Sequence, residues 1–105
     1  MGSEFVEIQV TCGAAHEART IADALVERRL AACVQLVPIR STYRWEGAVE
    51  RDDEVLLLIK TTARRTDEVE ATVHDLHSYD VPAFTVVEIV SGSDDYLAWV
   101  RAETT

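Results

Sequence analysis

The spacing of apolar residues along the chain predicts strands and helices in alternation. Residues 6–12 place an apolar side chain at every second position, the pattern of a strand with one buried face. Residues 15–29 repeat apolar side chains at intervals of three and four, which indicates a helix. We expect the buried stripe of that helix to contain Ala18, Ile21, Ala22, Leu25 and Val26.

Two long apolar runs in residues 30–61 flank a short turn at Glu46–Gly47–Ala48, which predicts a β-hairpin. Each arm has about fourteen residues and would measure roughly 45 Å at about 3.3 Å per residue. A domain of about 100 residues has a radius of gyration near 13 Å. We therefore expect the hairpin to extend beyond its own domain, with Tyr43 and Trp45 at an end that needs a partner chain.

The two arms of the hairpin predict different environments. Pro38 interrupts the first arm, and a proline cannot donate a hydrogen bond to a neighbouring strand, so we expect an edge strand there. Residues 55–59 of the return arm are apolar at every position, which is typical of a central strand covered on both faces. A long exposed edge arm predicts pairing with other chains in a closed oligomer.

A second helix is expected after the hairpin. Its N-cap would be Thr61, Thr62 or Thr66. Pro82 limits its C-terminal end, because the residue before a proline disfavours helix. The inward stripe of this helix is expected to comprise Val69, Val73, Leu76 and His77.

The last part of the chain predicts a strand and a short helix. Residues 83–90 are rich in β-branched side chains and suit a strand. Ser93 is expected to cap the last helix, and residues 102–105 are expected to be frayed. The inward side chains of that helix would be Tyr96, Leu97 and Val100.

The resulting order is β-α-β-β-α-β plus a short C-terminal helix, the ferredoxin-like sandwich of the α+β class. In this fold two helices cover one face of an antiparallel four-stranded sheet, and the first and third strands are central. A chain of 105 residues suits one domain, assigned to residues 6–105. Residues 1–5 are interpreted as a cloning remnant or disordered start, because Gly-Ser and Glu-Phe are encoded by two common restriction sites.

Composition narrows the range of partners. A net charge of −9 argues against binding to nucleic acid or to an anionic membrane, which both need a basic surface. Two cysteines are too few for a disulfide scaffold and fit a reducing cytoplasm. The sequence contains no apolar run long enough for a transmembrane helix and no secretory leader. We therefore expect a cytoplasmic protein.

No catalytic motif stands out, so we do not expect an enzyme. The chain has no glycine-rich phosphate loop, no H-E-x-x-H and no paired C-x-x-C, and the acidic run 52–54 reads as a solvated turn. Cys12, Cys33 and His77 are the more specific set, because thiolate and imidazole groups suit copper or zinc. The alternative is structural, with two buried small cysteines and a histidine that bonds the last carbonyls of a helix.

Five segments together resemble the CutA family of divalent-ion tolerance proteins. They occur in order between Val6 and Arg101 and read ARTIADALVERRLAACV, YRWEG, EVLLLIKT, HSYDVP and DYLAWV. The resemblance implies a homotrimer with the ferredoxin-like fold, in which long hairpins wrap neighbouring subunits. It also implies a role in tolerance of copper and other divalent ions, without a firm enzymatic activity.

The resemblance also implies site residues. Cys12 and His77 match the copper ligands of the bacterial pattern, with zinc and other divalent cations left open. Leu76 stands where some members carry a second histidine and Ser78 replaces the usual proline, and both departures weaken the metal assignment. Six positions match the inter-subunit cleft of the family, namely Cys33, Tyr43, Trp45, Glu54, Lys60 and Tyr79.

Two functional hypotheses follow, beside a third in which the protein is a purely structural scaffold and the trimer itself is the function. The first is a trimeric protein of divalent-ion tolerance that binds copper. The second is a signalling or sensing module, similar in architecture to the trimeric PII proteins, that holds a small ligand in the clefts between subunits.

Overall fold

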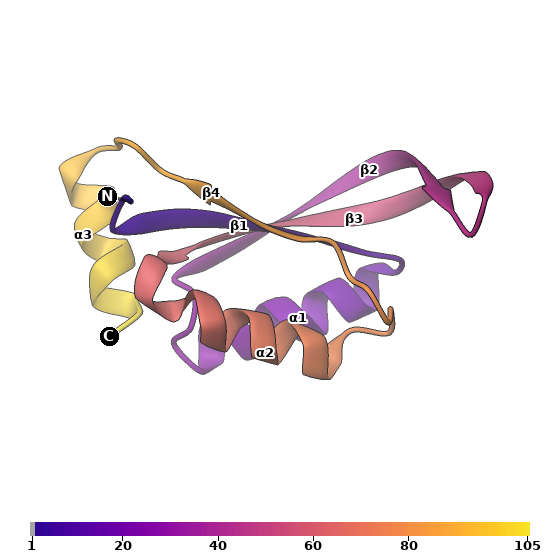
Figure 1. Ribbon diagram of the computed structural model, residues 1–105. Helices are drawn as coiled ribbons and strands as arrows, with labels where there is room; N and C mark the ends of the chain where they lie inside the picture. Colours follow the sequence, from indigo (N-terminus) through magenta and orange to yellow (C-terminus); the bar gives the residue numbers. More distant parts are fainter. Residues whose placement is uncertain (1) are drawn as a thin grey trace.

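The structure, a computed structural model, describes residues 2–105 and confirms the predicted order of elements. These are the strands β1 (Phe5–Cys12), β2 (Cys33–Trp45), β3 (Ala48–Thr62) and β4 (Phe84–Glu88), the helices α1 (Ala15–Glu27), α2 (Thr66–Leu76) and α3 (Asp94–Glu103), and the short 3-10 helix η1 (Ala63–Arg65). The strands form one antiparallel sheet in the order β2-β3-β1-β4, so the first and third strands are central as predicted. Helices α1 and α2 lie on the same face of it (Figure 1).

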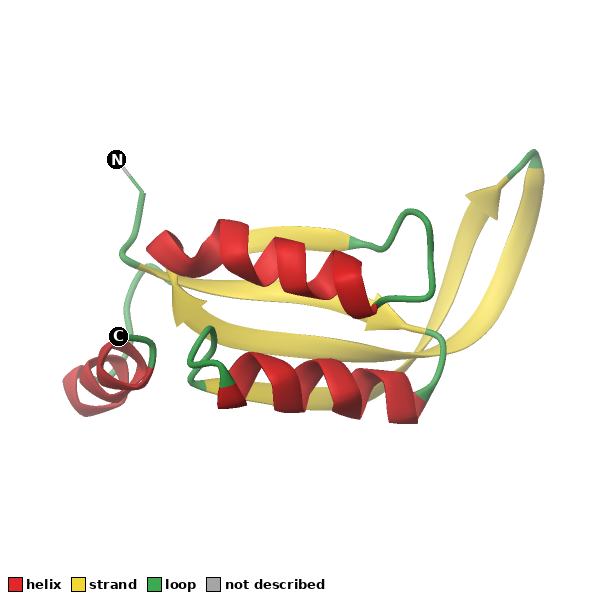
Figure 2. Ribbon diagram, turned by 90° about the horizontal axis from the view of Figure 1, so that it is seen from below, coloured by secondary structure: helices red, strands yellow, loops and turns green. Residues whose placement is uncertain are grey.

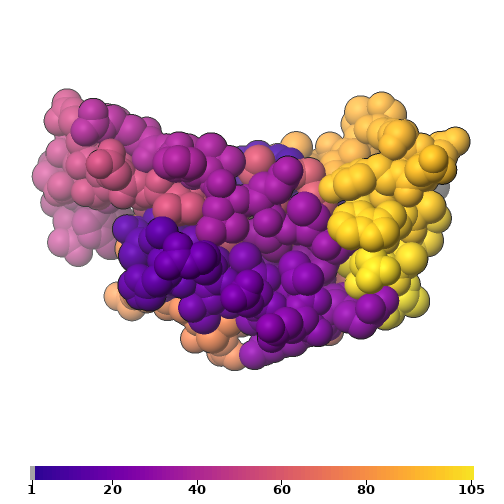
Figure 3. Space-filling model, turned by 180° about the vertical axis from the view of Figure 1, so that it is seen from behind, coloured from indigo at the N-terminus to yellow at the C-terminus, as the bar shows by residue number. Residues whose placement is uncertain are grey.

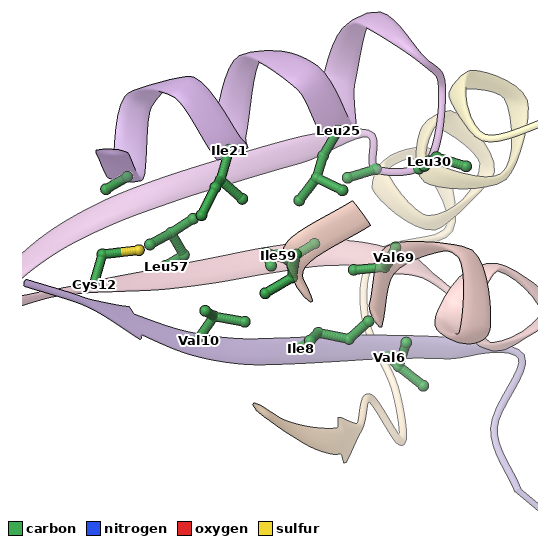
Figure 4. Packing of buried hydrophobic residues seen from close by; sticks show 13 residues of the cluster. Val6, Ile8, Val10, Cys12, Ile21, Leu25, Leu30, Leu57, Ile59 and Val69 are labelled. Carbon is green, nitrogen blue, oxygen red and sulfur yellow. The ribbon is translucent and has the colours of Figure 1, made fainter. Parts of the chain in front are cut away.

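The main core fills the space between these two helices and the sheet. The alternating residues Val6, Ile8, Val10 and Cys12 of β1 are buried, as the spacing predicts, and they pack against α1, α2 and β3 (Figure 4). Four of the five apolar positions predicted for the stripe of α1 are also buried. Val26 is the exception, with 42% of its surface exposed, because it lies at the rim of the stripe.

The hairpin extends past the domain as its length predicts. Its turn consists of Glu46 and Gly47, which both have positive φ angles, of 48° and 82°, whereas Ala48 already belongs to β3. This two-residue turn matches the right-handed twist of the flanking strands. The molecule measures 44 × 26 × 22 Å, and Figure 2 shows the outer half of the hairpin beyond the area that α1 and α2 cover.

The two faces of β3 are not equally covered, so the prediction of a strand buried on both faces is wrong for a single chain. Leu57 and Ile59 point toward the helices and are fully buried. Leu56 and Leu58 point to the opposite face and are only half-buried. Helix α3 covers just one end of that open face, where Val100 packs with Phe5 and Ala32.

Helix α2 begins without the predicted threonine cap. Thr66 is its first residue, and within residues 2–105 no side chain caps α2 or the preceding η1. The cap position is Arg65, because η1 leads directly into α2 and continues the helical path of the backbone. The helix ends at Leu76, and His77 follows in an extended conformation rather than on the inward stripe.

The C-terminal segment is held more firmly than predicted. Ser93 does cap α3, since its side chain accepts a hydrogen bond from the backbone N–H of Tyr96. Tyr96 itself is 40% exposed, which contradicts its predicted inward position. Thr104 is fully buried, and its carbonyl accepts a 2.8 Å hydrogen bond from Arg65, so the tail is not frayed there.

The N-terminal residues also make contacts. Ser3 donates from its hydroxyl to the carbonyl of Ile89 at 2.6 Å, and Glu4 pairs with Arg101 at 2.7 Å. Strand β1 begins at Phe5, one residue earlier than predicted. The cloning origin of residues 1–5 stays a prediction, and Met1 lies outside the described residues. None of the helices in residues 2–105 is long and apolar enough to cross a membrane.

Two adjacent buried threonines provide a matched test of this packing. The hydroxyl of Thr61 donates to the carbonyl of Leu30 at 2.7 Å, whereas the hydroxyl of Thr62 has no partner among the described residues. Thr61→Val should lower the free energy of unfolding by about 1–3 kcal/mol, because it leaves the Leu30 carbonyl unpaired. Thr62→Val should be neutral or stabilising. Denaturant unfolding at one fixed protein concentration measures both, and equal effects would contradict this assignment.

Candidate functional site

A cleft lies in the surface between the outer hairpin and the segment that follows α2. Its volume is about 720 Å³. Aromatic rings and carboxylates dominate its lining, namely Tyr43, Trp45, Asp52, Glu54, Tyr79 and Asp80. Figure 3 shows the hairpin projecting at one end of the molecule and α3 at the other.

The hairpin supplies four of these six side chains because of its register. Tyr43 and Trp45 are separated by one residue on β2 and therefore point the same way. Asp52 and Glu54 are likewise two apart on β3, and they pair in the ladder with Ser41 and Ile39. Strand β2 thus supplies two aromatic side chains to the cleft, and strand β3 supplies two acidic ones.

Each of two carboxylates accepts a hydrogen bond from a phenol. The Tyr43 hydroxyl donates to Asp52, and the Tyr79 hydroxyl donates to Glu54 at 3.1 Å. The hydrogen bond to Asp52 raises the pKa of Tyr43 to about 12. Burial, followed by the bond to Glu54, raises the pKa of Tyr79 to about 12. Both phenols therefore stay protonated donors at neutral pH.

Glu54 is the most buried acid of the cleft. Only 8% of its surface is exposed, and the hydroxyl of Tyr79 is its hydrogen-bond partner. None of the described residues that line the cleft is basic. A buried carboxylate whose partner is a neutral hydroxyl has no opposite charge to balance its own. With acidic and no basic side chains among the described residues of its lining, the cleft carries an excess of negative charge.

Cys12 is the last residue of β1, and its side chain lies in the apolar core, where Figure 4 shows its sulfur beside Leu57. Burial raises the pKa of its thiol to about 12, and the nearby carboxylates of Glu17 and Glu54 add to this shift. The thiolate is the form that binds metals and attacks electrophiles. At neutral pH Cys12 is therefore a buried, protonated thiol.

Both ring nitrogens of His77 form hydrogen bonds with the backbone. Its side chain is buried, its Nε2 lies 2.7 Å from the carbonyl oxygen of Thr11, and its Nδ1 accepts a 3.1 Å hydrogen bond from the backbone N–H of Tyr79. These two bonds require a neutral ring protonated at Nε2. Glu17 Oε1 lies 4.0 Å from Nδ1 and also accepts from Ser78.

Cys12 and His77 are both engaged within the chain in this arrangement. A ligating histidine offers a free lone pair, and the lone pair of His77 Nδ1 accepts the hydrogen bond from Tyr79. A ligating cysteine is deprotonated, whereas burial raises the pKa of the Cys12 thiol. Within residues 2–105 no group of three or more His, Cys, Asp or Glu side chains is placed to hold a metal ion.

The six residues assigned to an inter-subunit cleft divide into two places. Tyr43, Trp45, Glu54 and Tyr79 line the cleft described above. Cys33 and Lys60 are ladder partners at the opposite end of the hairpin. There Lys60 Nζ lies 2.9 Å from Glu7 and donates to Gln35, so its charge is already paired within the chain.

Sequence reasoning missed two acids of the cleft. Asp52 was expected in a solvated turn together with Asp53 and Glu54. All three belong to strand β3, where Asp52 and Asp53 are exposed and Glu54 is buried, and Asp52 lines the cleft. The hairpin register could have identified Asp52. Pairing the residues outward from the Glu46–Gly47 turn places Asp52 on the same face of the hairpin as Tyr43. Asp80 lies between the end of α2 and Pro82, and local spacing does not predict that this segment meets the hairpin.

Comparison with known proteins identifies the family. The model of the CutA1 divalent ion tolerance protein family matches residues 6–103. The divalent-cation tolerance protein CutA of Thermus thermophilus is 46% identical over 98 residues, which cover 92% of this chain and 95% of that protein. Protein CutA of Homo sapiens is 43% identical over 90% of this chain, but the chain spans only 54% of the human protein.

Solved structures agree with these sequence matches. The structure described as the periplasmic divalent cation tolerance protein CutA from Archaeoglobus fulgidus superposes with a TM-score of 0.94 at 34% identity. The match covers 96% of this chain and 99% of that one. With its fold, its hairpin and nearly its whole length matched, the chain belongs to the CutA1 divalent ion tolerance family.

Proposed function

We propose that this protein acts in divalent-cation tolerance as a homotrimer that senses a small ligand in the hairpin cleft and catalyses no reaction. The observation that carries this proposal is the cleft itself, which combines a volume of about 720 Å³ with a buried carboxylate and three aromatic rings. Volumes of about 300–1,000 Å³ are typical of small-molecule sites. The family name supports the link to divalent cations.

The open face of the sheet supports assembly. Leu56 and Leu58 are only half-buried there, and Val37 and Val87 on the same face are 37% and 46% exposed. The outer hairpin adds Trp45, which is 50% exposed, and an unpaired edge along β2. Apolar faces and strand edges of this kind are covered by other chains in stable proteins, and in a trimer a neighbour would also close the open side of the cleft.

Binding without catalysis is supported by the state of the two reactive side chains. An active nucleophile needs a lowered pKa or an adjacent base, whereas the pKa of the Cys12 thiol is raised. His77 has both ring nitrogens in structural hydrogen bonds, so it is not free to act as a general base. The two free thiols also favour the cytoplasm as the location, although the Archaeoglobus fulgidus relative is described as periplasmic.

Copper binding at Cys12 and His77 is the second candidate. The ring of His77 bonds the carbonyl of Thr11, the residue before Cys12, so both side chains lie at the same end of β1. Binding there would require deprotonation of the thiol and loss of the bond from the Tyr79 N–H to His77. We therefore place this candidate second to the cleft.

The assembly can be tested on the open face. Leu58→Lys puts a charge where we propose a subunit contact, and it should shift sedimentation velocity from trimer toward monomer. Val26→Lys is the matched control, because Val26 is 42% exposed on helix α1, across the sheet from the open face. A trimer that survives Leu58→Lys with unchanged stability would rule out this face as the contact.

Copper titration separates the two candidates. Because the pKa of Cys12 is about 12, a site that uses its thiolate should bind Cu(II) more tightly as the pH rises from about 7 to 9. If the cleft is the functional site, Cys12→Ala should leave the calorimetric isotherm at pH 7 unchanged, as should the control Cys33→Ala. Loss of binding in Cys12→Ala, with Cys33→Ala unaffected, would favour the copper site instead.

A ligand panel tests the cleft. Melting temperature is measured in metal-free buffer with ATP, glutamine, glucose and choline, which represent anionic, zwitterionic, neutral and cationic compounds. At least one class should raise the melting temperature by mass action, and Glu54→Gln should reduce that rise. Asp53→Asn, the same loss of charge on an exposed neighbour, should not. A panel without any response that depends on Glu54 would contradict a sensing cleft.

A further inference from the structure

We infer that the ligand of the cleft is a small organic ammonium ion, either an amine or a quaternary ammonium compound. This inference rests on the proposed function and names the ligand class of the same cleft. Three features of the lining carry it: the sign of the charge, the burial of one carboxylate and the row of aromatic rings.

The charge of the lining selects a cation. Asp52, Glu54 and Asp80 all line the cleft, and no described residue with a basic side chain lines it. The basic neighbours Arg44 and Arg51 alternate with the lining residues along β2 and β3, so they lie on the other face of the hairpin. An anionic ligand such as a phosphate would meet three carboxylates without a counter-charge, whereas a cation would be attracted.

The burial of Glu54 gives that cation a defined position. This carboxylate is 8% exposed and has one neutral partner, the hydroxyl of Tyr79 on Oε2. A buried carboxylate is costly unless an opposite charge or several donors satisfy it. A cation seated next to Glu54 would supply the missing charge without displacing the bond from Tyr79.

The aromatic rings favour an organic cation over a bare metal ion. Tyr43, Trp45 and Tyr79 line the same cleft, and none of them is fully buried, with 38%, 50% and 38% of their surfaces exposed. Aromatic faces attract ammonium groups and accommodate the methylene or methyl groups attached to them. Residues 2–105 also offer no cluster of three acids or histidines that could coordinate a metal, and a volume of about 720 Å³ suits a molecule.

Choline and its uncharged carbon analogue 3,3-dimethyl-1-butanol have the same shape and differ in charge, so they form the first test. Calorimetry in metal-free, low-salt buffer should show one choline site per chain. The neutral analogue should bind about tenfold more weakly or not at all, which corresponds to about 1.4 kcal/mol. Putrescine serves as a primary-amine probe, and disodium glutarate as an anionic one.

Charge-removing variants form the second test. Glu54→Gln keeps an oxygen for the Tyr79 hydroxyl and should weaken choline binding about tenfold, and Asp80→Asn on the exposed loop should weaken it less. Asp53→Asn has the same change in charge outside the cleft and should bind choline as the wild type does. Circular dichroism and sedimentation confirm the fold of each variant, and Asp80→Asn keeps the test valid if Glu54→Gln fails to fold.

The possible results are distinguishable. Equal affinity for choline and its neutral analogue, or full choline binding in both cleft variants, would overturn the ammonium inference. A second contrary result is binding of glutarate or glucose that depends on Glu54, while neither choline nor putrescine binds. That result would overturn the ammonium inference but leave the cleft as the ligand site. Absence of binding by every probe would overturn the ammonium inference and the sensing cleft together.

Discussion

The unequal pairing of β3 is the constraint on which the rest of the structure depends. Strand β3 pairs with β2 from Ala48 to Lys60, but it pairs with β1 only from Val55 to Thr62. The half of the hairpin nearer the turn therefore lacks both a third strand and the helix layer. The inner half builds the core, and the outer half is free to form one wall of a cleft and to reach another chain.

The second wall of the cleft depends on how the chain leaves α2. The extended backbone at His77 ends the helix, and the buried ring of His77 joins the carbonyl of Thr11 to the N–H of Tyr79. Ser78 is tied to Glu17 of α1 at the same time. These bonds fix the segment against β1 and α1, so the hydroxyl of Tyr79 reaches Glu54 across the cleft.

Much of the fold could be predicted from local spacing, because alternation and helical periodicity reflect one buried face. Strand β1, the edge position of the strand with Pro38 and the cap at Ser93 follow from such patterns. Local spacing fails where distant contacts decide. Leu58 looks like a fully buried residue but is only half-buried, because α3 covers just one end of its side of the sheet. Thr104 looks like a free end but is buried, and its hydroxyl donates to the carbonyl of Val100.

The candidate site shows the same limit in its chemistry. Residue types suggest Cys12 and His77 as metal ligands, a prediction that depends on whether the fold leaves the thiolate and the ring lone pair free. In this structure burial raises the pKa of the Cys12 thiol, and Nδ1 of His77 accepts a hydrogen bond from Tyr79. His77 instead positions Tyr79, which donates to the buried Glu54. A histidine with this task would be essential to the cleft without touching any ligand, so its presence in a metal-tolerance family does not by itself require that it bind a metal.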